Sequence, residues 1–375
     1  MRTIQDRFGR NVDYLRISIT DKCNLRCVYC MPEKGNIFCQ EDKRLSSEEI
    51  YRIAKEASKL GIRKIRFTGG EPLVYDGIVD LIKKINSIDG IEEIALTTNG
   101  ILLDDIADDL IDNGLKKVNI SLDTLDKDKY YKITRGGDLD KVLSAIDKCL
   151  NKGTKVKLNV VIIKGTNDDE ILDLINLTLK KNIDVRFIEL MPIGEGKNYT
   201  GLSNKDIIKF LEDTGLKFKE EKRNVHDGPA EYIKLENAIG RVGFISAMSN
   251  CFCDNCNRIR ITTDGLLKQC LNWKSGINLK TLLKNGASDE KLRETIKEGI
   301  YNKPQKYLFK VEDENKSSDS TVYESSPVTI QYNSVLKQWE SSSCLNVSSS
   351  GEKGAGKWSF VPSLCADYDK FKAEE

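Results

Sequence analysis

Tyr14-Leu-Arg-Ile-Ser-Ile-Thr20 runs directly into Asp21-Lys-Cys-Asn-Leu-Arg-Cys-Val-Tyr-Cys30, so a strand-like segment is followed at once by a loop with three cysteines. Cys23, Cys27 and Cys30 have the spacing C-x3-C-x2-C. A closed [4Fe–4S] cluster is held by four cysteine thiolates, so three thiolates in one short loop leave one iron without a protein ligand. The stretch therefore predicts a strand that carries, at its carboxyl end, an iron–sulfur cluster with one open coordination position.

Two other kinds of metal site use cysteines in short loops, and both fit this loop less well. A structural zinc site takes four ligands, commonly from paired Cys or His residues, and the single histidine, His226, is far away along the chain. A bacterial ferredoxin run has the spacing C-x2-C-x2-C-x3-C, which this loop lacks. Cys39 follows nine residues after Cys30, outside that spacing. The open cluster is the favoured interpretation.

Composition excludes several classes of protein. The 375 residues include 59 Lys and Arg against 58 Asp and Glu, a net charge of +1, so no overall field attracts nucleic acid or a membrane surface. No run approaches the ~18 apolar residues of a membrane span, and no secretory apolar core is present at the N-terminus, which predicts a cytoplasmic protein. Eleven cysteines without an export signal indicate metal or redox chemistry. A single histidine argues against hydrolases built on a His-containing triad.

Short β-rich segments alternate with segments of helical periodicity from residue 14 to about 190. Six strands are predicted, at Tyr14–Thr20, Lys64–Thr68, Glu93–Thr98, Lys117–Leu122, Lys155–Ile162 and Asp184–Glu189. Five helices are predicted between them, at about 46–60, 76–88, 104–113, 138–151 and 168–181. Strands joined by helical crossovers pair in parallel. We therefore expect an α/β fold, a partial (β/α)6 barrel of the TIM type, with its chemistry at the carboxyl ends of the strands.

Alternation along the predicted strands separates an apolar face from a basic one. Leu15, Ile17 and Ile19 share the apolar parity. The opposite parity carries Arg16, Ser18, Thr20, Lys64, Arg66, Thr68, Asn119, Ser121, Lys155, Lys157 and Asn159. Buried parallel strands are usually apolar on both faces, so recurring cations on one parity predict a lumen for an anionic ligand, with a triphosphate as a natural candidate. Each cation taken alone could instead lie at a strand end and reach solvent.

A second group of cysteines lies in the later part of the chain. Cys253, Cys256 and Cys270 have the spacing C-x2-C-x13-C, again three thiols without an evident fourth ligand. Completion by Cys251 would instead give a closed zinc site. Two incomplete triads in one chain are better explained by two clusters, one that binds a cofactor and one that holds substrate. Arg258 and Arg260 alternate with an isoleucine, so an extended segment would turn both toward an anionic or carbonyl-rich ligand.

The first loop, with an aromatic residue before its last cysteine, resembles the signature of the radical S-adenosylmethionine (SAM) enzymes. A longer series of motifs, in order along residues 1–309, is similar to the GTP 3′,8-cyclases of molybdenum cofactor biosynthesis. The motifs are Asp21–Met31 with Pro32, Lys64–Pro72, Leu96–Gly100, Asn119–Asp123, Arg186–Met191, Gly228–Ala230, Gly243–Ser246 and Phe252–Arg260. Both cysteine triads have the spacing of that family.

The resemblance implies a radical SAM barrel followed by a smaller C-terminal iron–sulfur domain. Cys23, Cys27 and Cys30 would hold the first [4Fe–4S] cluster, whose free iron chelates SAM, and Cys253, Cys256 and Cys270 would hold the second, which meets the guanine. The residues implied to contact SAM are Tyr29, Gly70, Glu71, Ser121 and Met191. The residues implied to contact GTP are Arg16, Arg66, Thr97, Lys157, Arg258 and Arg260. Beyond the cofactors no catalytic residue is implied, although Arg258 and Arg260 would lie near the substrate.

The implied activity is that of a radical SAM lyase. Reductive cleavage of SAM would give a 5′-deoxyadenosyl radical that abstracts the ribose 3′ hydrogen of GTP, and the 3′ carbon would then bond to C8 of the guanine. The product would be (8S)-3′,8-cyclo-7,8-dihydro-GTP, which a separate enzyme, cyclic pyranopterin monophosphate synthase, consumes. The resemblance also implies a low-potential electron donor and a homodimer. The barrel would orient the substrate and protect the radical, while the cofactor supplies the difficult chemistry.

Three regions are expected along the chain. Residues 1–200 are predicted to form the barrel, 201–309 the auxiliary-cluster and substrate domain, and 310–375 an atypical tail with 14 serines, which indicates linker or loosely ordered sequence. Members of the family usually end in a Gly-Gly pair needed for turnover, whereas this chain ends Phe371-Lys-Ala-Glu-Glu375. The resemblance therefore implies that the tail disables catalysis, which cyclisation at a normal rate without an added C-terminal peptide would contradict. The near P-loop that ends at Lys357 has Trp358 where Ser or Thr is required.

Two other functions are compatible with the cysteines. A radical SAM peptide-maturing enzyme can carry auxiliary clusters in a C-terminal extension, but it gives no reason for Asn257-Arg-Ile-Arg260. A non-enzymatic iron–sulfur carrier would not cleave SAM when reduced. GTP binding that depends on Arg258 would separate the cyclase from the first of these, and SAM cleavage would separate it from the second.

Overall fold

The structure, a computed structural model, describes residues 3–34, 39–222, 228–250, 252–271 and 276–306, and the backbone of four short strands between residues 330 and 361. The chain divides into two compact units, Met1–Phe309 and Lys310–Glu375. His226 and Cys251 lie outside the described residues. Each unit is described by itself below.

Six parallel strands form the centre of the first unit, as predicted. They are β1 (Tyr14–Thr20), β2 (Lys64–Gly69), β3 (Glu93–Thr98), β4 (Leu115–Ser121), β5 (Lys155–Val160) and β6 (Ile183–Ile188). They pair in parallel in the order in which they occur along the chain. This sequential parallel pairing confirms the partial-barrel fold class, and it brings the carboxyl ends of all six strands to one edge of the sheet.

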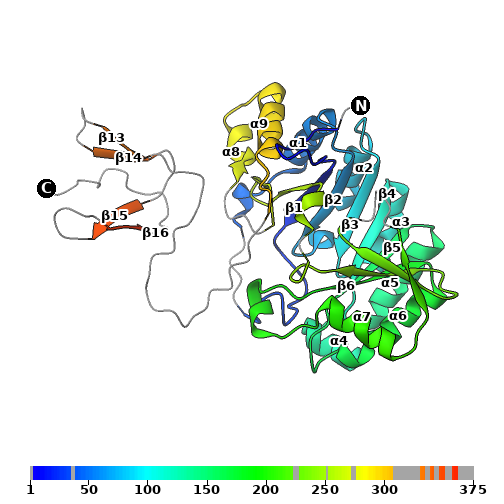
Figure 1. Cartoon of the computed structure of the whole chain (residues 1–375). Helices are drawn as coiled ribbons and strands as arrows, with labels where there is room; N and C mark the ends of the chain where they lie inside the picture. The colour runs from blue at the N-terminus through cyan, green and yellow to red at the C-terminus, as the bar shows by residue number, and fades with distance from the viewer. Residues whose placement is uncertain are drawn as a thin grey trace. The chain divides into compact units, whose positions relative to one another are not determined.

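Helices follow the strands and cover the outside of the curved sheet (Figure 1). They are α1 (Ser47–Lys59), α2 (Ile78–Asn86), α3 (Leu103–Asp112), α4 (Lys127–Thr134), α5 (Leu139–Asn151) and α6 (Ile171–Lys180). Helix α1 begins at a capping box in which the Ser46 hydroxyl accepts from the Glu49 backbone and the Glu49 carboxylate accepts from the Ser46 backbone. All of these helices except α4 were predicted from the sequence.

The later part of the chain extends both edges of the same sheet. Strand β9 (Arg241–Ile245) pairs in parallel with β6, and β10 (Arg258–Ile261) pairs in parallel with β1. Antiparallel strands continue outward: β8 (Glu231–Leu235) and β7 (Phe218–Glu221) beyond β9, and β11 (Leu266–Lys268) and β12 (Ile277–Asn278) beyond β10. Within the described residues this makes one sheet of twelve strands. Residues 201–309 thus share the barrel sheet, and the boundary at residue 200 stays a prediction.

Three further α-helices and five short 3₁₀ turns complete the described part of this unit. The helices are α7 (Asn204–Asp213), α8 (Leu279–Lys284) and α9 (Asp289–Tyr301). The turns are η1 (Glu41–Lys43), η2 (Pro72–Val74), η3 (Asp168–Glu170), η4 (Gly194–Asn198) and η5 (Cys253–Asn255). Helix α9 packs against α1, so the end of this unit lies beside its beginning.

The strands have one apolar face and one basic face, as the alternation in the sequence predicted. Leu15, Ile17 and Ile19 are almost fully buried in the core between the sheet and the helices, and each such side chain contributes roughly 1.5–3 kcal/mol to stability. On the opposite face Arg66 and Lys157 are also buried, with exposed fractions of 7% and 2%. Charged side chains at this depth require partners or a ligand.

The second unit contains two antiparallel strand pairs in its described part. Strand β13 (Ile330–Asn333) pairs with β14 (Gln338–Ser341), and β15 (Asn346–Ser350) pairs with β16 (Lys357–Val361). The serine-rich composition did not predict these strands. The two glycines of the near P-loop lie outside the described residues, and its lysine begins β16.

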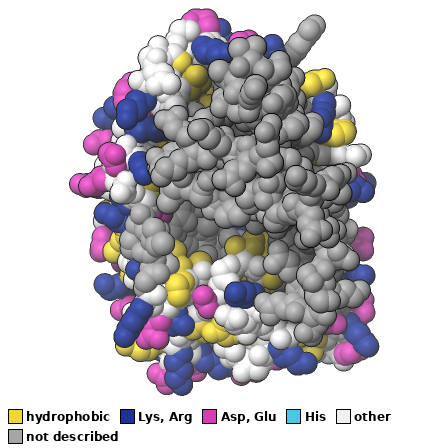
Figure 2. Space-filling model, turned by 90° about the vertical axis from the view of Figure 1, so that its left-hand side faces the viewer, with side chains coloured by type: hydrophobic (Ala, Val, Ile, Leu, Met, Phe, Trp, Pro, Cys, Tyr) yellow, Lys and Arg dark blue, Asp and Glu magenta, His cyan; other side chains and the backbone are white. Residues whose placement is uncertain are grey.

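Surface charge is mixed. In Figure 2, Lys and Arg side chains alternate with Asp and Glu around the described part of the face shown, in agreement with a net charge of +1. Within the described residues no helix combines the length and the apolar composition that a membrane crossing requires.

Candidate active site

The first cysteine loop lies at the carboxyl end of β1 and is fastened to the end of α4. Within the loop at residues 21–34, the backbone N–H groups of Arg26 and Val28 donate to the carbonyls of Thr134 and Ile133, at 3.1 and 2.9 Å. Because these bonds join the loop to a helix of the barrel, the cysteines have defined positions next to the strand ends.

Cys23, Cys27 and Cys30 are free thiols, the first two half-buried and the third exposed. Burial raises the pKa of each thiol, and for Cys27 the charges of Asp123 and the other two cysteines raise it further. Deprotonated sulfurs therefore need a positive partner here, which iron supplies. Among the described residues, no three His, Cys, Asp or Glu side chains surround a single metal ion. Three thiols in one loop fit a cluster in which each ligates a different iron.

Glycines at the end of β2 let the cysteine loop pass very close to this strand. A Cβ at Gly70 would lie 2.4 Å from the Lys22 carbonyl oxygen and 2.7 Å from that of Asp21. The Gly70 N–H donates to the Thr20 carbonyl and the Glu71 N–H to the Lys22 carbonyl, both at 2.8 Å. The close approach that requires glycine is thus made to the cysteine loop itself.

Glu71 is directed into the protein, with an exposed fraction of 1%. Its carboxylate accepts from the Leu73 N–H at 3.0 Å, from the Thr98 hydroxyl at 2.7 Å and from the Asn99 N–H at 2.7 Å. Burial raises the pKa of this carboxyl in spite of these donors. The carboxylate fixes the loops after β2 and β3, and its contact with SAM stays a prediction.

Tyr29 is also anchored by a carboxylate. Its hydroxyl donates to Asp123 Oδ2 at 2.6 Å, and the Val161 N–H donates to Asp123 Oδ1 at 2.8 Å. Asp123 follows β4 in the chain, so this pair ties the cysteine loop to the carboxyl ends of β4 and β5. Ser121 ends β4 on the same edge of the sheet.

A cavity of about 180 Å³ lies inside the barrel and is lined by cations from many strands. Among the described residues, these are Arg16, Lys64, Arg66, Lys117, Lys157, Arg186, Arg258 and Arg260. Five of the six predicted GTP contacts are in this set, and the sixth, Thr97, accepts from Arg66 Nη1 at 3.3 Å. The alternation along the strands predicted Lys64 on this face, whereas Lys117 and Arg186 were not predicted to contact the ligand. The exposed Lys155 lies outside this cavity, in a surface pocket, so its predicted place in the lumen is wrong.

Within the described residues, most of these cations form no ion pair with a carboxylate. Lys117 pairs with Glu93 at 2.6 Å and Lys157 with Asp184 at 2.8 Å. The other six have no carboxylate within 4.0 Å among the described residues, and the buried Nε atoms of Arg16, Arg66 and Arg186 have no hydrogen-bond partner. Burial lowers the pKa of Arg16 well below its usual range, and Arg260 lowers it further. Unpaired buried donors of one sign fit a polyanionic ligand.

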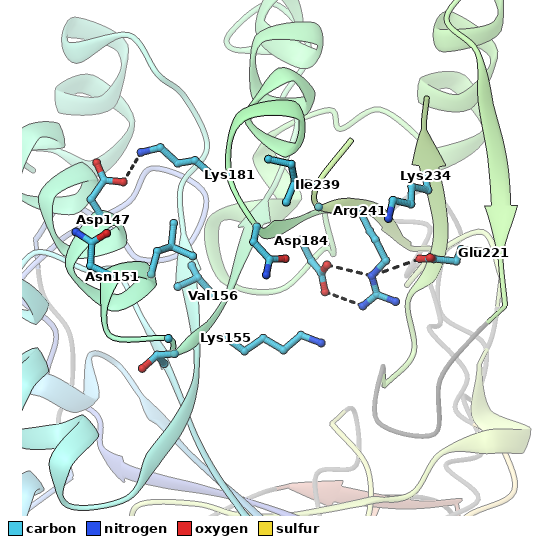
Figure 3. A pocket seen from close by; sticks show the side chains of 15 residues that line it. Asp147, Asn151, Lys155, Val156, Lys181, Asp184, Glu221, Lys234, Ile239 and Arg241 are labelled. Atoms are coloured by element: carbon cyan, nitrogen blue, oxygen red, sulfur yellow. Dashed lines mark hydrogen bonds and ion pairs between the residues drawn. The ribbon is translucent and has the colours of Figure 1, made fainter. Parts of the chain in front are cut away.

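An ion-pair network lies between this cavity and a surface pocket. The Lys157 ammonium bonds to Asp184 Oδ2 and to the Tyr232 hydroxyl, each at 2.8 Å, and Arg241 donates to both oxygens of Asp184. Figure 3 shows the outer side of this network, where Arg241 also faces Glu221. The surface pocket there has a volume of about 680 Å³ and lies away from both cysteine sets.

The second cysteine set adjoins the cation-lined cavity. Cys253, Cys256 and Cys270 line one small pocket together with Arg258 and Arg260, which also line the cavity. Met191, from the loop after β6, borders both spaces. Burial alone would raise the pKa of the Cys256 thiol, but the Arg258 guanidinium and the Lys303 ammonium lower it to about 6. A thiolate is therefore available for metal ligation at neutral pH.

Two family models cover nearly all of the first unit. Residues 17–178 match the radical SAM superfamily, and residues 183–309 match the family described as Molybdenum Cofactor Synthesis C. The chain is 56% identical to the GTP 3′,8-cyclase of Clostridium perfringens (strain SM101 / Type A) over 313 residues, which are 84% of this chain and 97% of that protein. The chain belongs to the GTP 3′,8-cyclase family.

Other relatives and solved structures agree. The GTP 3′,8-cyclase of Alkaliphilus oremlandii (strain OhILAs) is 49% identical, with 81% of this chain and 94% of that protein aligned. The crystal structure of Streptococcus suis SuiB bound to S-adenosylmethionine has a TM-score of 0.52 at 16% identity, covering 76% of this chain and 68% of that chain. This likeness shows the shared fold. As a radical SAM protein of the GTP 3′,8-cyclase family, the chain uses a [4Fe–4S] cluster and SAM.

Asp123 is expected to make the stability of this protein depend on pH. Burial raises the pKa of Asp123 from 3.8 to about 6, so the folded state binds this proton more tightly than the unfolded chain does. Its contribution to stability is therefore largest below pH 4 and is lost as the pH rises to about 6. We expect the free energy of unfolding of the parent protein, relative to Asp123→Asn, to fall by about 2 kcal/mol between pH 4 and 7. Urea unfolding of the cluster-free proteins measures this difference.

Replacement of the exposed Asp128 by asparagine is the control for loss of a carboxylate. A difference between parent and Asp123→Asn that stays constant across this pH range would show that Asp123 titrates in the folded protein as it does in the unfolded chain.

Asp184 is expected to contribute more to the stability of the protein than the other carboxylates around this surface pocket. Asp184→Asn removes the carboxylate that pairs with both the buried Lys157 and the half-buried Arg241, so we expect it to lower the free energy of unfolding by about 3 kcal/mol. The matched control is Asp147→Asn, which breaks the partly exposed Lys181 pair at the rim of the same pocket in Figure 3 and should cost about 1 kcal/mol or less. Urea unfolding measures both variants, and equal losses would contradict a special role for Asp184.

Proposed function

We propose that this chain is a radical SAM GTP 3′,8-cyclase that makes (8S)-3′,8-cyclo-7,8-dihydro-GTP, the first step of molybdenum cofactor biosynthesis. The observation that carries the proposal is the cavity with eight cations, six of which form no ion pair with any described carboxylate, that adjoins the second cysteine pocket. A nucleoside triphosphate supplies the missing negative charge and also presents a base to that pocket. The family assignment supports the same substrate.

The cofactor sites follow from the two cysteine sets. Cys23, Cys27 and Cys30 would hold the SAM-binding [4Fe–4S] cluster, and Cys253, Cys256 and Cys270 a second [4Fe–4S] cluster at the substrate. When bound, the first cluster together with SAM supplies the radical chemistry. The proposed SAM contacts are Tyr29, Gly70, Glu71, Ser121 and Met191.

The residues of the chain bind, orient and shield the substrate. Arg16, Arg66 and Lys157 would take the triphosphate, with Thr97 fixing Arg66, while Arg258 and Arg260 lie between the cavity and the second cysteine pocket. The Asp184 network lies between this cavity and the surface pocket and so would limit the access of water. Fixed donors in such a site stabilise charge without reorganisation, and a held geometry brings the reacting atoms together.

The proposal includes several partners. A low-potential electron donor would feed the first cluster, and a cyclic pyranopterin monophosphate synthase would take up the product. We also propose that the enzyme is a cytoplasmic homodimer that requires neither nucleic acid nor a membrane.

The test is anaerobic turnover of the reconstituted full chain with dithionite, SAM and GTP, followed by mass spectrometry of 5′-deoxyadenosine and a cyclised nucleotide. Both products would support the cyclase and would contradict the expectation that the 310–375 tail disables catalysis. Deoxyadenosine without the cyclised nucleotide would overturn the substrate assignment or show that the 310–375 region blocks turnover, and neither product would favour an iron–sulfur carrier. Tight GTP binding that is lost in Arg258→Ala would exclude a peptide-maturing enzyme.

A further inference from the structure

Lys303 is a buried lysine next to the second cysteine set, and it is not among the residues proposed above to contact SAM, GTP or iron. It follows the end of α9 by two residues and has an exposed fraction of 2%. Its ammonium donates to Cys256 Sγ at 3.3 Å and to the Gln269 carbonyl at 3.0 Å. Lys303 also lines the pocket that holds the three cysteines.

Lys303 lacks the partner that buried lysines usually have. Among the described residues no carboxylate lies within 4.0 Å of its ammonium, in contrast to the buried Lys117 and Lys157, which pair with Glu93 and Asp184. A buried ammonium is costly unless a negative group compensates it. Of the two groups to which this ammonium donates, the Cys256 sulfur can carry negative charge, so the position of Lys303 is explained when this sulfur is a thiolate bound to metal.

A separate contact fixes the segment that carries Lys303. The buried Arg10 guanidinium donates to the Cys253 carbonyl at 2.8 Å, to the Pro304 carbonyl at 2.7 Å and to the Gln305 carbonyl at 2.9 Å. Arg10 itself is held by Asp6 at 2.6 Å. One side chain thus joins the cysteine loop to the residues directly after Lys303, so the distance from the ammonium to the sulfur is set by the fold.

We propose that Lys303 is a positioning residue of the second cysteine site, whose ammonium donates to the Cys256 sulfur and raises the reduction potential of the [4Fe–4S] cluster bound there. This inference rests on the proposed function, because it requires that second cluster. Hydrogen bonds to the sulfurs and the surrounding charge are the means by which proteins tune such clusters. A fixed positive charge stabilises the more negative, reduced form of the cluster, so its removal makes reduction harder.

The experiment isolates the second cluster in the full chain. In a Cys23→Ala, Cys27→Ala, Cys30→Ala background, reconstituted anaerobically with iron and sulfide, we measure iron and sulfide per chain and the midpoint potential by redox titration with electron paramagnetic resonance. We expect Lys303→Met to lower the potential and to speed the loss of iron to a chelator. Lys303→Arg, which keeps the charge, should remain near the background protein. Lys297→Met removes an exposed lysine from α9 and should change neither property.

The outcomes distinguish failure of the proposed second cluster from failure of the proposed role of Lys303. A background protein that takes up no cluster would overturn the second cluster, and with it the proposed function as stated. A cluster whose potential and iron loss are unchanged in Lys303→Met would overturn only the role of Lys303. Should Lys303→Met not fold, Lys303→Gln takes its place, and an arginine variant shifted as far as the uncharged variants would equally overturn the role of the charge.

Discussion

Gly70→Ala is expected to reduce SAM cleavage by about 100-fold or more while the remainder of the barrel stays folded, because displacements near 1 Å at a reacting centre have effects of this size. An alanine Cβ would lie 2.4 Å from the Lys22 carbonyl oxygen and 2.7 Å from that of Asp21. Both contacts are with backbone, which cannot rotate away as a flexible side chain can. The loop that carries Cys23 would have to move away from the end of β2.

The control for Gly70→Ala is Gly77→Ala. Gly77 has a φ of 82° and open space where a Cβ would be, so alanine there costs about 1 kcal/mol of backbone strain without a collision. We expect Gly77→Ala to cleave SAM at close to the parent rate. The readouts are 5′-deoxyadenosine formation and iron bound at the first site, and a parental rate for Gly70→Ala would show that the close packing of the loop is not needed.

The strands could be predicted from the sequence because their apolar and polar side chains alternate clearly. Helix α4 could not be predicted. Its residues Lys127–Thr134 are mostly polar, and only Tyr130, Ile133 and Thr134 are buried. A helix of 8 residues with so narrow an apolar face has little periodic signal. Its N-cap was visible in the sequence, since the Asp126 side chain accepts from the Lys129 backbone. The backbone N–H groups of Arg26 and Val28 in the cysteine loop bond to the last residues of α4, and such contacts between distant segments are not contained in a local sequence pattern.

The alternation of side chains along the strands correctly placed cations on the face of the sheet that lines the cavity, but it could not identify the carboxylates that pair with them. Lys157 lies opposite Asp184 only in the register of β5 and β6, and Lys117 meets Glu93 across β4 and β3. Pairing between strands depends on register, which the sequence of one strand does not fix. Lys303 is a clearer case, since 47 residues separate it from Cys256 and no spacing rule relates them.

Arg16→Met is expected to change stability and GTP affinity in opposite directions. Arg16 is on β1, lines the cavity, and has a buried Nε without a hydrogen-bond partner. Burial and the nearby Arg260 lower the pKa of Arg16, which means that its charge is unfavourable in the ligand-free protein. Methionine has a similar length and no charge. We expect the free energy of unfolding of the ligand-free protein to rise by about 1–3 kcal/mol.

The same substitution removes a proposed contact with the triphosphate. Charge-assisted hydrogen bonds contribute roughly 1.5–3 kcal/mol each, so we expect the dissociation constant for GTP to rise about 10- to 100-fold. Titration calorimetry measures the affinity, and urea unfolding without and with GTP measures stability and its linkage to binding. Arg52→Met is the control, because Arg52 pairs with Asp289 on the surface between α1 and α9 and should leave GTP affinity unchanged.

Changes of opposite sign in stability and in GTP affinity distinguish an arginine that binds ligand from an arginine that stabilises the fold. An arginine kept for the fold loses stability when it is replaced, and ligand affinity then falls only as a consequence of unfolding. An arginine whose role is to bind an anion destabilises the ligand-free protein, and the bound anion compensates its charge. Its removal therefore raises the stability of the ligand-free protein while it lowers the affinity for the anion. A loss of stability in Arg16→Met together with unchanged GTP affinity would therefore contradict the proposal that the unpaired cations of this cavity exist for the triphosphate.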